Sequence, residues 1–480
     1  MLRDEDESRE TTEQGLLEGK AVSRREFLKF AGIAGAVVGV GGGLGGLLAA
    51  CGGSTTTTTA AGPTTTAAVG ASTTASTSGA STTAVSTGGS GPGKDKIVIG
   101  AARPISGSLS FFEANAFGPA YKMWVKEVND AGGLNIMGAK VPIELKIYDD
   151  QSNLDNTTRL LTKLMEEDKV DFILPPTSTA FLFAAAGVAN AHKYILISGE
   201  GGATSLEKEM NAGKLPYYYQ FLSYSDHNQI PVLADILKEV GAKSCVFLYI
   251  DDLHGIEYQS VAQYYLPAAG IQIVQNTAIP ADIKDISSVL KQAQKANPDV
   301  LWCECYPDQN ILCMKTLLQL NYNPKMIGFG PGGNYQFMYN AFAGQMENVA
   351  SMGAWNAKSS PGAKDLVAKL TAFLGGKTDN IDWWGHSIYW GELSFFQQSI
   401  ETANTLNQDA IRDVMNKTHF QTVLGDTFIT NQQLDISCYL GQIGQWQKGI
   451  FEVIDPGVHR TAPPVYPKPA YPAPATAPST

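Results

Sequence analysis

The chain has 480 residues, 44% hydrophobic and 17% charged, so its length allows two or three domains with a sizeable core. Thirty-five Lys and Arg against 46 Asp and Glu give a net charge of −11, and no basic face is evident in the sequence, which argues against a nucleic-acid partner. Six cysteines are too few for a disulfide-stapled fold, so core packing must hold the structure together.

The first 50 residues have the pattern of an export signal. Ser23-Arg24-Arg25-Glu26-Phe27-Leu28-Lys29 matches the twin-arginine pattern, and no residue from Phe30 to Ala50 is charged. Leu48-Ala49-Ala50-Cys51 then resembles a bacterial lipobox, in which the cysteine thiol receives a lipid. We therefore expect residues 1–50 to be a twin-arginine lipoprotein signal peptide. Cys51 would anchor the mature protein to the outer face of the cell membrane.

Low-complexity segments flank the globular part of the chain. Residues 52–93 contain only Gly, Ala, Ser, Thr, Val and Pro, including 14 Thr, and cannot bury enough apolar surface to fold. Together with Cys51 they predict a disordered tether over residues 51–93. Residues 455–480 contain eight prolines, which predict an unstructured tail.

Short apolar runs alternate with helical patterns between these ends, which predicts βαβ units on parallel sheets and an α/β fold. The polar segment Tyr217–Gln229 interrupts the alternation and indicates a crossing into a second lobe. Helices are predicted at Phe117–Ala131, Asn156–Glu167 and Ser287–Lys295. Strands are predicted at Lys96–Ala101, Ile143–Tyr148, Phe172–Leu174, Tyr194–Ile197, Cys245–Ile250, Ile271–Asn276, Val300–Cys305 and Met326–Phe329.

Loops after these strands carry motifs in a recognisable order. Over roughly residues 96–454 the chain resembles the type I periplasmic solute-binding proteins of ABC importers, in the branch of the Leu/Ile/Val-binding proteins. The matching motifs are Pro104-Ile105-Ser106-Gly107-Ser108, Asn129-Asp130-Ala131-Gly132-Gly133-Leu134, Tyr148-Asp149-Asp150, Thr177-Ser178-Thr179, Ser198-Gly199-Glu200-Gly201-Gly202-Ala203-Thr204, Tyr249-Ile250-Asp251-Asp252-Leu253-His254-Gly255, Tyr306-Pro307-Asp308 and Gly330-Pro331-Gly332-Gly333-Asn334.

The resemblance implies two Rossmann-like lobes that are joined by three crossings and close on a ligand between them. Lobe 1 would comprise residues 94–220 and 350–425. Lobe 2 would comprise residues 221–349 and, with the last crossing, residues 426–454. The ligand-binding residues that it implies are Phe112, Ser178, Thr179, Ala203, Thr204, His254, Tyr306 and Trp384.

The same resemblance implies a monomeric, non-enzymatic receptor without a cofactor or a metal. It would capture a small molecule and deliver it to an ABC permease in the membrane. A ligand sensor that signals through a protein partner has the same fold, and the sequence does not separate these two roles.

One position departs from the family pattern and bears on the ligand. Amino-acid-binding members often place an acid in the loop that here contains Gly332, where it pairs with the ligand's ammonium. Glu200, Glu304 or Asp308 could replace it. We therefore expect a carboxylate or an amide without a strict α-amino requirement, with branched-chain amino acids as the alternative. Glu113 also stands where a glycine is usual, which predicts a different shape for that wall.

An exported enzyme that carries a cofactor is the main rival class. Cys303, Cys305 and Cys313, with Cys245 on a neighbouring strand, have a spacing that fits neither a zinc ribbon nor the common iron–sulfur runs. Gly328-Phe329-Gly330-Pro331-Gly332-Gly333 matches a dinucleotide-binding pattern, but Pro331 removes an N–H group that a pyrophosphate would need. The sequence thus contains no set of residues that predicts catalysis.

Overall fold

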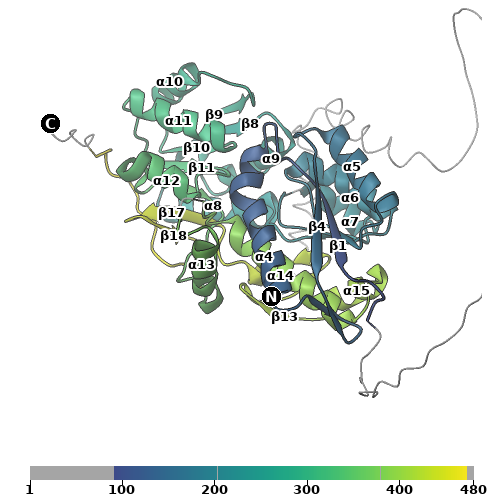
Figure 1. Cartoon of the computed structure of the whole chain (residues 1–480). Coiled ribbons are helices and arrows are strands. Elements are labelled where there is room, and N and C mark those ends of the chain that lie inside the picture. The colour runs from purple at the N-terminus through teal and green to yellow at the C-terminus, as the bar shows by residue number, and fades with distance from the viewer. Residues whose placement is uncertain (1–90, 203, 379, 473–480) are drawn as a thin grey trace, which may run out of the picture.

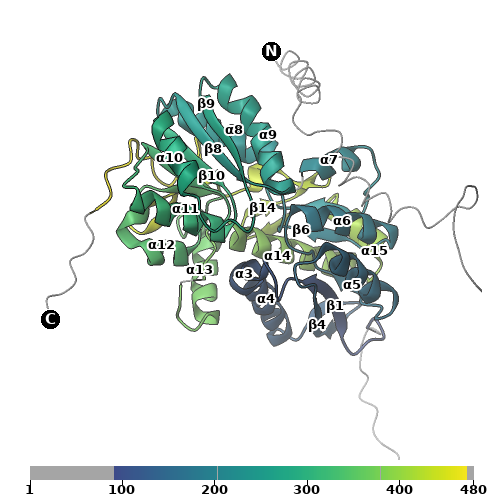
Figure 2. The same cartoon turned by 90° about the horizontal axis from the view of Figure 1, so that it is seen from above.

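The structure is a computed structural model that describes residues 91–202, 204–378 and 380–472. Cys51, Ala203 and the predicted signal peptide lie outside the described residues. Two α/β lobes lie side by side, each with helices packed against a sheet (Figures 1 and 2). This architecture confirms the predicted fold class of two lobes with parallel sheets.

Lobe 1 is built around β1 (Ile97–Arg103), whose Ile97, Ile99 and Ala101 are fully buried. β1 lies between β4 (Ile143–Asp149) and β5 (Phe172–Ile173) and is parallel to both. A second group of strands has the order β15 (Ile429–Thr430), β16 (Gln433–Leu434), β7 (Tyr218–Gln220) and β6 (Leu196–Ser198).

The helices of lobe 1 connect these strands and cover them. Several begin with a side-chain cap: Asn153 accepts a hydrogen bond from the Asn156 N–H at the start of α5, for example. They are α3 (Ser110–Phe112), a π-helical turn (Glu113–Phe117), α4 (Gly118–Asp130), α5 (Leu154–Glu166), α6 (Thr179–Ala191), α7 (Thr204–Asn211), α13 (Pro361–Phe373), α14 (Gly385–Ala403) and α15 (Gln408–Met415). Two hairpins complete the lobe: β2 (Leu134–Ile136) with β3 (Ala139–Val141), and β13 (Phe420–Thr422) with β14 (Gly425–Thr427).

Lobe 2 contains one seven-stranded sheet, in which every residue of the interior strand β10 is buried. Its apolar run Val300–Cys303 is typical of a parallel strand that is covered on both faces. The strand order is β18 (Ile450–Val453), β17 (Ile443–Gln447), β12 (Ala350–Met352), β11 (Met326–Phe329), β10 (Val300–Glu304), β8 (Ser244–Ile250) and β9 (Gln272–Ile279).

Helices cover both faces of this sheet because successive strand side chains point to opposite faces. Val246 and Leu248 of β8 share a core with α10 (Ser287–Ala296), α11 (Pro307–Gln319) and α12 (Gln336–Phe342). Cys245 and Phe247 share the opposite core with α8 (Ile230–Glu239) and α9 (Leu253–Ala268).

The strand pairing locates the three crossings between the lobes. The first lies between β7 and α8, within the predicted polar segment. The second follows Met352, because β12 still pairs within lobe 2. The third follows Leu434, because β16 pairs with β7. β12 thus extends to Met352, beyond the predicted boundary at 349/350, and the third crossing lies between Leu434 and Ile443, inside the predicted segment 426–454.

All eight predicted strands and all three predicted helices correspond to observed elements with small shifts at their ends. The proline-rich tail differs from the prediction. Residues 455–472 pack along lobe 2, where the Lys468 N–H donates to the Lys325 carbonyl at 2.7 Å and the Tyr471 hydroxyl to the Tyr322 carbonyl at 3.1 Å. Prolines lack a donor but keep a free carbonyl, and Asn323 donates to the carbonyl of Pro469. The lobe 2 surface therefore holds a segment that composition alone predicts to be unstructured.

Across the described parts of the chain, none of the helices combines the length and the apolar character that a membrane span requires.

Candidate functional site

A cavity lies between the two lobes, beyond the carboxyl ends of their parallel strands. This is where open α/β sheets place their ligands. Its volume is about 50 Å3, enough for a few water molecules. The lining residues are Phe112, Phe117, Thr177, Ser178, Thr179, Glu200, Gly201, Gly202, Leu222, His254, Tyr306, Pro331, Tyr335, Asp382, Trp384 and Tyr389.

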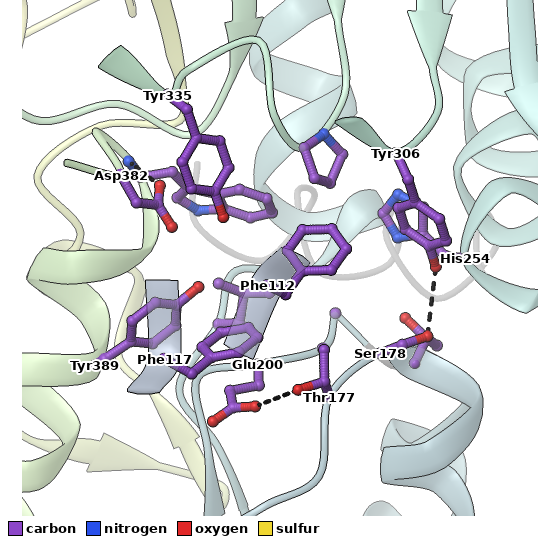
Figure 3. A pocket seen from close by; sticks show the side chains of 16 residues that line it. Phe112, Phe117, Thr177, Ser178, Glu200, His254, Tyr306, Tyr335, Asp382 and Tyr389 are labelled. Carbon is purple, nitrogen blue, oxygen red and sulfur yellow. Dashed lines mark hydrogen bonds between the residues drawn. The ribbon is translucent and has the colours of Figure 1, made fainter. Parts of the chain in front are cut away.

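The lobes touch each other across this cavity. The hydroxyl oxygens of Ser178 and Tyr306 are 3.4 Å apart, and the Phe112 and Tyr306 rings meet edge to face with centroids 5.6 Å apart. Figure 3 shows the Ser178 hydroxyl facing the Tyr306 hydroxyl. Residues of both lobes therefore meet at the cavity.

The structure brings together six of the eight predicted ligand-binding residues. They all line the cavity: Phe112, Ser178, Thr179, His254, Tyr306 and Trp384. Thr204 does not line it, because its hydroxyl faces the Ser225 hydroxyl at 3.1 Å and the Asp226 carboxylate at 3.4 Å. Ala203 is not among the described residues.

The start of α6 faces the cavity and is suited to bind an anion. Its N-cap residue, Ser178, has a φ of 83° and makes no side-chain cap hydrogen bond. The first backbone N–H groups of a helix have no acceptor within the helix, and the helix dipole adds partial positive charge there. This end of the cavity can therefore hold a carboxylate.

His254, at the start of α9, faces this end of the cavity from lobe 2. Its Nε2 lies 3.2 Å from Oε1 of Glu304, and its ring stacks on Tyr306 with centroids 5.4 Å apart. Burial alone would lower the pKa of His254, but the hydrogen bond and the charge of Glu304 outweigh burial and raise it. The protonated imidazole would add positive charge opposite the start of α6.

Glu200 forms part of the cavity floor, and its carboxylate is held by lobe 1. Arg103 donates to both of its oxygens, at 2.6 and 2.7 Å, and the Thr177 hydroxyl donates at 3.1 Å. The Tyr121 hydroxyl donates as well. Burial raises the pKa of Glu200 to about 7, although Arg103 opposes the shift.

Two further acids belong to this buried cluster. Glu113 accepts from Arg103 Nε at 2.8 Å, so the acid that replaces a glycine here holds the guanidinium in place. Glu392 of α14 is fully buried, and neither of its carboxyl oxygens has a hydrogen-bond partner with good geometry. Burial, followed by the charge of Glu200, raises the pKa of Glu392 well above its usual range.

The acids predicted to replace the family's ammonium partner do not present a free carboxylate to the cavity. Glu304 is fully buried between His254 and the Trp302 indole, which donates at 2.8 Å. Asp308 is exposed on α11 and is not among the lining residues. Glu200 is held by Arg103. Another acid, Asp382, lines the cavity from the segment before α14.

Sequence reasoning missed Asp382 and several aromatic walls. Asp382 stands two residues before the predicted Trp384, and Tyr335 directly follows the predicted loop that ends at Asn334. Their proximity in sequence to these predicted residues is the one feature that could have indicated a place in the site. No sequence feature indicates such a place for Phe117 or Tyr389, because aromatic residues in helices usually pack in a core.

The described cysteines are free and buried. Cys303 and Cys305 lie in one core of lobe 2, and Cys245 lies in the core on the opposite face of the sheet. Burial raises the pKa of Cys245 and Cys305. These thiols therefore pack as small hydrophobic groups.

Comparisons with known proteins agree with this geometry. The model of the periplasmic binding protein family matches residues 96–449. A Leu/Ile/Val-binding protein homolog 8 of Brucella abortus is 25% identical over 384 residues, which cover 75% of this chain and 90% of that protein. A Leu/Ile/Val-binding protein homolog 7 of Brucella suis is 21% identical over 389 residues, covering 77% of this chain and 93% of its own.

Solved structures share the fold. The leucine-binding protein LivK of Thermotoga maritima superposes with a TM-score of 0.63 at 17% identity, over 75% of this chain and 99% of its own. The substrate-binding protein LivJ of Streptococcus pneumoniae, solved with isoleucine, gives 0.62 at 18% identity, over 75% and 98%. A solute-binding protein of an ABC transporter from Rhodopseudomonas palustris, solved with 3,4-dihydroxybenzoic acid, gives 0.61 at 20% identity, over 73% and 93%.

Proposed function

The chain belongs to the periplasmic binding protein family, as a solute-binding protein of the branched-chain amino acid type, and on this premise we propose what it binds and delivers. It captures a small amphipathic carboxylate, amide or amino acid between its lobes and passes it to an ABC permease. Membership of the family implies a location outside the cytoplasm, where Cys51 would tether the protein to the membrane. The homologues are solute-binding proteins, which supports a binding role over catalysis.

The cavity between the lobes is the observation that supports this proposal most strongly. It combines the start of α6, which can hold a carboxylate, with walls formed by Phe112, Tyr306 and Trp384. Cavities that fix a small polar group within apolar walls are typical of small-molecule sites. Neighbours of this fold hold isoleucine in one case and 3,4-dihydroxybenzoic acid in another, so one scaffold accommodates both ligand classes.

Ligand binding is expected to close the two lobes. A ligand that contacts both lobes stabilises the closed state by its differential affinity. A thermal-shift screen that includes isoleucine and 3,4-dihydroxybenzoate should identify binders, since a ligand at 100 times Kd stabilises the protein by about 2.7 kcal/mol. Small-angle scattering should then show a smaller radius of gyration at saturation. A binder that raises the melting temperature and leaves the radius unchanged would contradict closure.

The Cys51→Ser protein is expected to lose its membrane association. The two or three acyl chains of a lipobox cysteine would be the strong apolar anchor of the mature protein. Ultracentrifugation of cell lysates should leave this variant in the supernatant, while the control Ser54→Ala in the same segment still sediments with membranes. Mass spectrometry must show that the signal has been cleaved. The anchoring proposal fails if cleaved Cys51→Ser protein still sediments.

A further inference from the structure

The cavity has two separate polar ends. Figure 3 shows Ser178, His254 and Tyr306 at one end and Asp382 beside Tyr335 at the other, with Phe112 between them. The first end, at the start of α6, is suited to a carboxylate. The second end contains an acidic group and therefore attracts the opposite charge.

Asp382 is 2% exposed and is held by neutral donors. Its Oδ1 accepts from the backbone N–H groups of Trp384 and Gly385, both at 2.9 Å, and from the Asn334 amide. These bonds fix the carboxylate at the start of α14. The Tyr335 hydroxyl also hydrogen-bonds to the carboxylate. All of these partners are neutral and supply no formal charge.

Among the described residues, no Lys or Arg forms an ion pair with Asp382. The nearby His386 donates from Nε2 to the Ala116 carbonyl at 2.9 Å and accepts from the Asp382 N–H at 3.1 Å through Nδ1, which is the neutral ring. Burial, opposed by the charge of Asp382, lowers the pKa of His386, in agreement with that assignment.

A buried carboxylate without a cation is costly, and buried acids in proteins are rarely left unpaired. Asp382 faces a cavity that opens when the lobes separate, so a ligand can supply the missing charge. The rings of Tyr335, Tyr389 and Trp384 line the same end of the cavity, and aromatic faces also attract cations.

We propose that the ligand is a zwitterion with separated charges: a carboxylate that binds at the start of α6 and an ammonium or similar cation that binds Asp382, joined by an apolar spacer beside Phe112. This inference rests on the proposed function and narrows its ligand class. It places the ammonium partner on a different segment from the loop that contains Gly332. An α-amino acid carries both charges on one carbon, so the proposal predicts that it binds less tightly than a zwitterion with separated charges.

Matched ligand pairs test the proposal in the wild-type protein. The pairs are 5-aminopentanoate with pentanoate and 4-(aminomethyl)benzoate with 4-methylbenzoate, with leucine as the α-amino acid, measured by titration calorimetry and thermal shift. At least one of the two zwitterions should bind ten times more tightly than the matched compound that lacks the ammonium, and also more tightly than leucine. The proposal is overturned if neither zwitterion is preferred to its partner, including the case in which neither binds, or if leucine binds more tightly than both.

Asp382→Asn identifies the residue responsible. The amide oxygen can still accept from the N–H groups of Trp384 and Gly385, so the start of α14 is preserved, which circular dichroism should confirm. The preference for the zwitterion should fall to threefold or less. The control Asp308→Asn makes the same charge change on the exposed part of α11 and should keep the preference. If the Asp382→Asn protein prefers the zwitterion as strongly as the wild-type protein does, a group other than Asp382 binds the ammonium and the proposal is overturned.

Failure of the proposed function would give a different result. In that case no compound of a wider screen, branched-chain amino acids included, would shift the melting temperature or the radius of gyration. Failure of the inference alone would leave a wild-type protein that binds carboxylates or α-amino acids and closes around them.

Discussion

Replacing Arg103 by methionine is expected to destabilise the folded protein by about 3–5 kcal/mol, the usual cost of removing one partner from a buried ion pair. Arg103 is fully buried at the end of β1. Its guanidinium pairs with Glu113 at 2.8 Å and Glu200 at 2.6 Å, and it also donates to the Pro175 carbonyl. It thereby joins the loops after β1, β5 and β6. Methionine would leave two acids buried without a cation.

The stability deficit of Arg103→Met is expected to grow with pH. Burial raises the pKa of Glu200 to about 7 even with Arg103 beside it, and removal of Arg103 would raise this pKa further. The folded pKa of Glu200 exceeds the unfolded value, which is about 4.3. Between these two pKa values the unfolded chain binds fewer protons than the folded chain, so stability falls as the pH rises and is lowest above the folded pKa. At pH 5 Glu200 is protonated in both folded proteins, so the deficit should be smaller than at pH 8.

Thermal unfolding followed by circular dichroism at pH 5 and pH 8 checks both expectations. The control Lys126→Met removes an equal charge from an exposed ion pair with Asp130 and should leave the midpoint almost unchanged. If Arg103→Met melts like wild type at pH 8, or if its deficit is larger at pH 5, the buried cluster does not stabilise lobe 1 in the way described.

The parts of the fold that sequence predicts are those where local pattern and tertiary environment agree. Val300–Cys303 is a continuous apolar run and lies in β10, an interior strand of the lobe 2 sheet. Ala350–Met352 has only three residues, and its pairing with strands on both sides makes it a strand. Residues 455–472 contain many prolines, and their order depends on acceptors and donors of lobe 2 that are distant in sequence. The composition of such a segment indicates its local conformational preference, but it does not indicate which distant residues will form hydrogen bonds with it.

The candidate site divides in the same way. Ser178, His254 and Tyr306 follow parallel strands, and the carboxyl ends of such strands converge at one edge, so their place in the cavity could be predicted. Asp382 lies in the segment between α13 and α14, where no strand end fixes a direction. Thr204 does follow a strand, but the direction of its hydroxyl depends on Ser225 from a later segment. Position along a strand predicts proximity to the site, whereas side-chain direction requires the tertiary structure.

Gly353→Ala is expected to destabilise the protein and to weaken ligand binding at the same time. Gly353 directly follows β12 at the second crossing, has a φ of +66°, and donates its N–H to the Gln442 carbonyl of the third crossing. A Cβ at this position would lie 1.8 Å from Cγ of Trp384, whose ring lines the cavity. An alanine must therefore displace Trp384 and also adopt a left-handed conformation.

A matched glycine separates these two effects. Gly375 has a φ of +69°, and a Cβ there would meet nothing within 4 Å, so Gly375→Ala introduces only the conformational cost, about 1–2 kcal/mol. Overpacking of a buried site costs about 1–3 kcal/mol more, which Gly353→Ala should add, together with a loss of affinity of tenfold or more for any compound that binds wild type. Thermal midpoints and titration calorimetry on the two variants measure the difference. If the two variants have equal thermal midpoints and equal ligand affinities, Trp384 can move without a cost in free energy. The contact between Gly353 and Trp384 would then not link the second crossing to ligand binding.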